Sequence, residues 1–135
     1  MITLDLMTGA QDAVVKLLRE QLPADQREMV RHSLRKDMPT PFHLIGDITS
    51  DNAGGKAEQL EQIEVDVHTV YKGTDRRELL GLMHQVRLAT DDKIIVIDGA
   101  HFRVGWAGAA AGGASTIDGV TYAGVTSLEL YAEPA

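Results

Sequence analysis

The sequence predicts an α+β fold, with two helices packed on one face of a mainly antiparallel sheet of four to five strands, in the order α-β-β-α-β-β. Two segments carry apolar residues at helical spacing, and a third alternates apolar and polar residues. Such alternation leaves one sheet face in water, as in antiparallel sheets. With 135 residues, 44% of them apolar, we expect a single domain, residues 1–135.

The first helix is expected to begin at a capping box formed by Thr8 and Gln11 and to end at Pro23. Its buried face carries apolar residues at helical spacing: Ala13, Val14, Leu17, Leu18 and Leu22. Residues 24–38 fit either a short helix with an outward row of arginines or a loop with one short strand. Pro39 and Pro41 then favour extended backbone.

Two strands are expected next, over residues 42–48 and 61–71, joined by a mobile loop over residues 50–59. In the second strand Ile63, Val65, Val67 and Thr69 would face the core, with Glu64, Asp66 and His68 in water.

The second helix follows a capping box formed by Asp75 and Glu78. Its apolar stripe is predicted to contain Leu79, Leu82, Met83 and Val86, with Leu80 widening it. A third β-region then begins with residues 93–97. Asp98-Gly99 is a strong two-residue hairpin signal, so this region could be a short hairpin. The Gly- and Ala-rich residues 107–118 are expected to form a second mobile loop before a long final strand.

The net charge of −7 is unevenly distributed. Residues 1–41 are balanced, so the excess of acidic side chains lies in residues 42–135. This distribution disfavours free nucleic acid as a partner. The absence of cysteine excludes disulfides, thiol nucleophiles and Cys-based zinc sites. The start of the chain lacks the pattern of a signal peptide, and no apolar run is long enough to span a membrane, so we expect no membrane partner.

No residue pattern specifies a reaction. Asp66 and His68 could both reach one metal ion, with His43 or His101 as a third ligand, but a solvated sheet face is the simpler interpretation. His84 is interpreted as a structural histidine. Ser115 and Ser127 lack the sequence context of an activated nucleophile, and Gly112-Gly113 indicates a flexible loop more than a phosphate site. We therefore expect no catalytic residues, no metal and no cofactor.

Two features remain as candidate interaction surfaces. The first is a basic cluster whose members could contact acidic surface on another subunit: Arg27, Arg31, Arg35 and Lys36. The second is the pair of loops 50–59 and 107–118, including Gly112 and Gly113, which could fold against a partner. Trp106 lies where the second loop begins, and an exposed tryptophan would be a good binding hot spot.

Several short strings resemble the phage tail terminator, or tail-completion, family found in phages, prophages and gene transfer agents. The resemblance covers roughly residues 8–133. It rests on the strings Pro41-Phe42-His43-Leu44-Ile45-Gly46, Val67-His68-Thr69-Val70-Tyr71, Asp98-Gly99-Ala100-His101-Phe102-Arg103-Val104 and Asp118-Gly119-Val120-Thr121-Tyr122-Ala123-Gly124-Val125.

The resemblance implies a structural, non-enzymatic virion protein. Such a protein forms a six-fold ring on the tail tube, ends tail polymerisation and offers a surface to the head-tail connector protein. Its partners would be further copies of itself, the major tail tube protein and the connector. It would act in the host cytoplasm during assembly and reside at the head-tail junction of the virion. The alternatives are another head-tail connector or neck protein, or a small dimeric ferredoxin-like enzyme or ligand-binding domain.

Overall fold

A computed structural model describes residues 3–33, 38–55, 58–116 and 119–135. The chain begins with helix α1 (Leu6–Gln21), a short 3₁₀ helix η1 (Ala24–Met29) and the two-residue strand β1 (Val30–Arg31). Strands β2 (Phe42–Asn52) and β3 (Glu61–Gly73) lead to helix α2 (Arg76–Thr90). The chain ends with β4 (Lys93–Ile97), β5 (Ala100–Thr116) and β6 (Gly119–Pro134).

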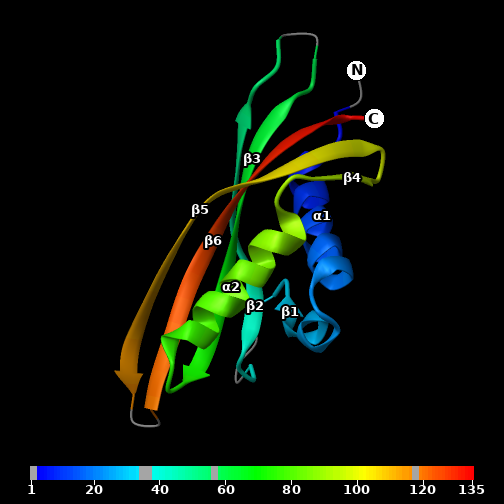
Figure 1. Cartoon of the computed structure of the whole chain (residues 1–135). Helices are drawn as coiled ribbons and strands as arrows, with labels where there is room; N and C mark the ends of the chain where they lie inside the picture. The colour runs from blue at the N-terminus through cyan, green and yellow to red at the C-terminus, as the bar shows by residue number, and fades with distance from the viewer. Residues whose placement is uncertain (1–2, 34–37, 56–57, 117–118) are drawn as a thin grey trace.

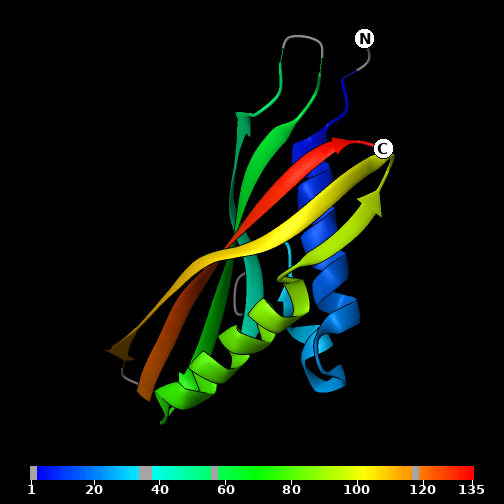
Figure 2. The same ribbon diagram turned by 45° about the horizontal axis from the view of Figure 1, so that its top comes forward.

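The six strands of the described segments form one sheet in the order β1-β2-β3-β6-β5-β4. The β1–β2 pair is parallel, and the other four pairs are antiparallel. The sheet is strongly twisted, and α1 and α2 both lie on its concave face (Figures 1 and 2). None of the described residues forms a layer over the opposite face of the sheet.

The predicted fold class is wrong in three respects. The sheet has six strands instead of four to five, it is mixed because β1 runs parallel to β2, and η1 is a third helical segment. Residues 24–38 contain both structures that the sequence offered as alternatives, because η1 and β1 follow each other directly. A two-residue strand has no periodicity of its own, so only its pairing with His43 and Leu44 makes it a strand.

The inner face of the sheet follows the predicted alternation. Ile63, Val65, Val67 and Thr69 on β3 are all fully buried. They pair with alternate residues of β6 that are buried as well. Phe102 on β5 is the largest fully buried side chain, and α1 packs directly over it. The core therefore lies between the concave face of the sheet and the two helices.

Two local predictions about the helices are wrong. The N-cap of α1 is Asp5, whose carboxylate accepts hydrogen bonds from the Thr8 amide at 3.0 Å and the Thr8 hydroxyl at 2.7 Å. Thr8 therefore lies inside the first turn, because an aspartate three residues earlier satisfies its amide. On α2, Leu80 is 47% exposed and does not widen the buried stripe.

Two other sequence signals are confirmed, one of them only in part. Asp75 is the N-cap of α2 and accepts a hydrogen bond from the Arg77 amide at 2.9 Å. Glu78, the other half of the predicted capping box, bonds the side chain of Tyr71 instead. Asp98 and Gly99 both have positive φ, 46° and 81°, and connect β4 to β5 as a two-residue turn. A turn with positive φ at both central positions matches the twist of a hairpin, which explains the Asp-Gly pair.

Substitution of Gly81 by alanine should stabilise the protein. Gly81 lies in the interior of α2, and a Cβ added there would have no atom within 4 Å. Alanine then contributes its helix propensity and restricts the unfolded chain, together worth about 1 kcal/mol. Urea unfolding of Gly81→Ala should give a higher midpoint with an unchanged slope. Gly9→Ala is the matched contrast, since its Cβ would lie 2.7 Å from Phe102 Cζ; an equal gain there would show that the helix contact is loose.

Candidate interaction surfaces

The described part of the predicted basic cluster is engaged in local structure. Arg27 on η1 donates from Nε to the Leu22 carbonyl at 2.9 Å and from Nη2 to the Glu20 carbonyl at 3.1 Å. Arg31 donates from Nη1 to the carbonyls of Glu28 and Val30. Arg35 and Lys36 lie outside the described residues. Arg27 thus braces the turn after α1, and Arg31 braces the junction of η1 and β1. Their predicted contact with another subunit remains a prediction.

Removal of the Arg27 guanidinium should loosen the end of α1. The carbonyls of the last helical turn have no intrahelical partner, and a cation there also complements the helix dipole. Arg27→Ala should lower the unfolding free energy by about 1 kcal/mol, since both bonds are charge-assisted but partly exposed to water. Chemical denaturation checks this value. Arg27→Lys should recover only part of the loss, because a single ammonium group cannot span both carbonyls as the guanidinium fork does; full recovery would show that charge alone matters.

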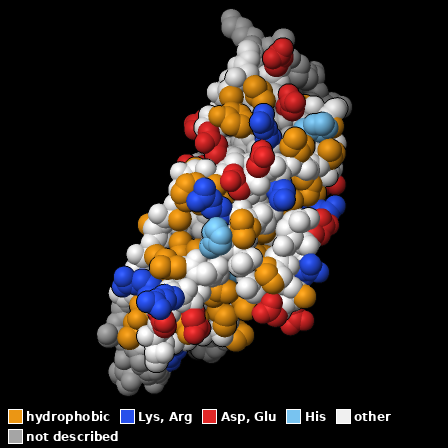
Figure 3. All heavy atoms as spheres, viewed as in Figure 1, with side chains coloured by type: hydrophobic (Ala, Val, Ile, Leu, Met, Phe, Trp, Pro, Cys, Tyr) orange, Lys and Arg blue, Asp and Glu red, His pale blue; other side chains and the backbone are white. Residues whose placement is uncertain are grey.

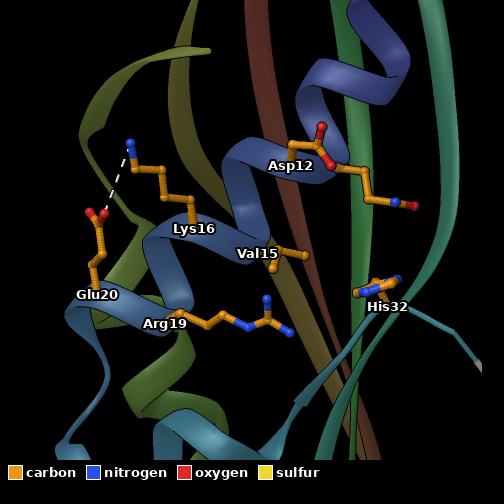
Figure 4. A pocket seen from close by; sticks show the side chains of 7 residues that line it. Asp12, Val15, Lys16, Arg19, Glu20 and His32 are labelled. Atoms are coloured by element: carbon orange, nitrogen blue, oxygen red, sulfur yellow. Dashed lines mark ion pairs between the residues drawn. The ribbon is translucent and has the colours of Figure 1, made fainter. Parts of the chain in front are cut away.

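A shallow hollow of about 380 Å³ lies beside this brace, between α1 and the chain that follows β1. Arg19 and His32 extend into it from the two sides, whereas Lys16 turns towards Glu20 (Figure 4). The Lys16–Glu20 pair is 4.0 Å apart and half exposed, so it contributes little to stability. Asp12 lines the same hollow. With charges of both signs, this hollow selects for neither anions nor cations.

Trp106 and the segment after it differ from the sequence prediction. The described residues of the predicted loop 107–118 are strand up to Thr116, and Trp106 lies within β5 instead of at a loop base. The indole ring is partly buried under the guanidinium of Arg87, whose Cζ lies 3.9 Å from the ring centroid. The Trp106 amide donates to Asp91 Oδ1 at 3.0 Å. Trp106 is therefore held by α2 and by the turn after it.

Beyond Trp106, β5 and β6 form a hairpin arm, defined here as residues 107–116 and 119–127. The arm is paired along its length, with a register shift between Trp106 and Gly108. On its other side β5 pairs with β4 only up to Val104, so the described part of the arm has one free strand edge. Gly112 and Gly113 lie on this arm and are exposed. Figure 1 shows the arm extending away from the end of the molecule that holds both termini.

The first predicted loop, residues 50–59, is also partly strand, because β2 continues to Asn52. Asn52 Oδ1 accepts a hydrogen bond from the Gly54 amide at 3.1 Å and so starts the turn. Gln59 anchors the other end through Leu4, with its amide group bonded to both backbone groups of that residue at 3.0 and 2.8 Å. The described part of this connection is thus tied to the start of α1.

The uncovered face of the sheet, called the outer face below, is acidic. Alternation of the strands places Glu64 and Glu129 directly opposite each other on β3 and β6. Glu129 accepts hydrogen bonds from Gln62 and, at 3.1 Å, from the hydroxyl of Tyr131. This bond is the main reason why the pKa of Tyr131 is raised. By the same register the other acidic side chains of the outer face are Asp51, Asp66 and Glu133.

The outer face also has an apolar end at β4. Ile94 is 70% exposed, Val96 is 52% exposed and Tyr131 is 46% exposed. Ile94, Arg103 and Tyr131 form one row across β4, β5 and β6. Together with Leu60 they line a hollow of about 480 Å³. The sequence predicts only a β-region over residues 93–97 and does not identify Ile94 and Val96 as exposed.

The four residues considered as metal ligands do not come together. Asp66 and His68 are on the outer face, where Asp66 accepts a hydrogen bond from Ser127 at 3.0 Å. His43 is fully buried on the inner face, with Nδ1 2.8 Å from Thr69 Oγ1. Burial lowers the pKa of His43 to about 4. Within the described residues no group of three His, Asp or Glu side chains could hold a metal ion.

The chain matches no protein-family model and no curated protein. In the segments that the structure describes, neither α1 nor α2 nor η1 has the length and apolar character of a membrane-crossing helix.

Proposed function

We propose that the protein is a structural component of virion assembly that caps the tail tube as a ring of identical subunits and stops tube growth. The observation that carries this proposal is the hairpin arm. It combines a free strand edge with small exposed side chains such as Ala109, Ala110 and Gly112. Unpaired strand edges accept backbone hydrogen bonds from a partner, and glycine in a strand permits close approach of another backbone.

The resemblance to tail terminators and the absence of any recognisable reaction motif in the sequence support the same function. In this role the arm contacts the last ring of tube subunits, and the opposite end of the subunit remains available to the head connector. Ring closure needs a head-to-tail contact between different surfaces of neighbouring copies. No free nucleic acid or membrane takes part.

The test is arrest of tube growth. Purified protein added to polymerising tail tube subunits should shorten the tubes and appear as a ring at their ends in negative-stain images. Ala110→Arg, which places a long charged side chain on the arm, should weaken the arrest, whereas the control Met7→Arg on the exposed side of α1 should not. Unchanged tube lengths with the unmodified protein would refute the proposal.

A further inference from the structure

We infer that the solvent-facing side of α2 in one copy docks on the outer face of the sheet in the next copy. This contact is the subunit interface of the proposed ring, and the inference therefore rests on the proposed function. The two surfaces lie on opposite sides of the subunit, because α2 covers the concave face and leaves the outer face uncovered (Figures 1 and 2). A contact between them is head-to-tail and can repeat around a ring.

The solvent-facing side of α2 carries arginines at its N-terminal end and has its own apolar stripe. Leu80 and Leu88 are 47% and 56% exposed, with exposed His84 between them. Arg76 and Arg77 lie in the first turn of α2 together with Glu78, after the N-cap Asp75. Arg76 lies over the ring of Tyr122, which leaves Arg77 as the arginine free to face a second copy. Figure 3 shows this side of the molecule, where acidic side chains lie beside the Lys and Arg, His and hydrophobic side chains along the course of α2. An amphipathic surface helix normally has one apolar face, and that of α2 is already buried.

The outer face supplies the opposite charge. The row of Glu64 and Glu129 lies next to the row that contains Tyr131, because the strands alternate by two residues. Two carboxylates placed directly opposite each other repel, so a cation between them is stabilising. Arg77 is the α2 residue best placed for this role, since it lies one turn before Leu80. The positive end of the α2 dipole would approach the same carboxylates.

The apolar spacings also match. Leu80 and Leu88 are eight residues apart, which corresponds to about 12 Å along a helix. Tyr131 and Ile94 are separated by two strand spacings, or about 10 Å. A helix lying across the strands can therefore place Leu80 on Tyr131 and Leu88 on Ile94. Burial of these four exposed side chains supplies the hydrophobic part of the binding free energy. The pairing of Arg77 with Glu64 and Glu129 fixes the direction in which the helix lies.

The experiment is a charge exchange followed in solution. Unmodified protein is expected to associate between about 1 µM and 1 mM in sedimentation equilibrium, and more weakly at high salt. Arg77→Glu and Glu64→Arg should each weaken association about tenfold, and the double variant should restore it to within about threefold. Leu88→Glu should abolish association, whereas Met7→Glu on the exposed side of α1 should not. Thermal melts establish that each variant is folded.

A monomer at every concentration, or single variants that associate normally, would overturn the contact. The double variant gives the sharpest result, since failure to restore association means that Arg77 and Glu64 do not meet. Tube-growth assays on the same variants separate the two proposals. Variants that associate poorly but still arrest tubes would show capping without this contact. Normal association with no arrest would leave the contact in place and refute the capping function.

Discussion

Stability against unfolding should fall by about 3 kcal/mol between pH 7 and pH 4 because of His43 alone. The imidazole is fully buried, and burial lowers its pKa from 6.5 to about 4. In the unfolded chain the same group regains its ordinary pKa and binds a proton more readily. His43 therefore contributes its full stability above pH 6.5. This contribution is lost as the pH falls through 6.5 towards 4, and the folded state gives up nothing further below that.

The contacts of His43 explain why it must stay neutral. Its Nδ1 lies 2.8 Å from Thr69 Oγ1, and Nε2 is buried without a hydrogen-bond partner among the described residues. A charged imidazolium would need a partner for both nitrogens.

Urea unfolding of wild type and His43→Asn at a series of pH values isolates the contribution of His43 to the pH dependence of stability. Asparagine has an amide close to the position of Nδ1 but does not titrate, so the variant should be less stable at pH 7 and flatter towards pH 4. His84→Gln on the exposed side of α2 is the control and should keep the wild-type slope. An identical pH dependence for His43→Asn would mean that carboxylates, not His43, govern acid unfolding.

Periodic signals in the sequence predicted much of the local structure. The alternation in β3 and the Asp98-Gly99 turn are found where they were expected. The fold class was wrong because the deciding elements carry no such signal. Val30 and Arg31 become a strand only through pairing with β2, and the Ala- and Gly-rich residues 107–116 become a strand through the register of β6. The low strand propensity of alanine and glycine is outweighed there by regular pairing with β6.

The candidate surfaces show the same limit. Arg27 and Arg31 were identified as basic residues, but the sequence could not show that their side chains donate to nearby backbone carbonyls. The paired carboxylates Glu64 and Glu129 are more than sixty positions apart in the sequence, so only the sheet register brings them together. Leu80 follows the buried residue Leu79 directly. Helical spacing alone did not show whether Leu80 belongs to a wide buried stripe or to a separate, exposed side of α2.

Loss of the Phe102 ring should be the most damaging single change, because the residue contacts three elements, β4, β6 and α1. Phe102 pairs with Ile95 on β4 and Ala132 on β6, and it is fully buried. From the helix side, a Cβ on Gly9 would approach Phe102 Cζ to 2.7 Å, so α1 rests on the ring. Truncation to alanine leaves a cavity that the sheet and α1 can only partly close. Phe102→Ala should therefore lose about 4 kcal/mol.

A double-mutant cycle with Gly9 tests whether the ring sets the position of α1. Gly9→Ala alone forces a Cβ into the ring and should destabilise by about 1 kcal/mol even after the helix-propensity gain. In a Phe102→Leu background, itself expected to lose about 1 kcal/mol, the smaller side chain removes the clash and Gly9→Ala should become stabilising. Urea unfolding of the four proteins gives the coupling. Additive effects would mean that α1 and the ring do not share this contact.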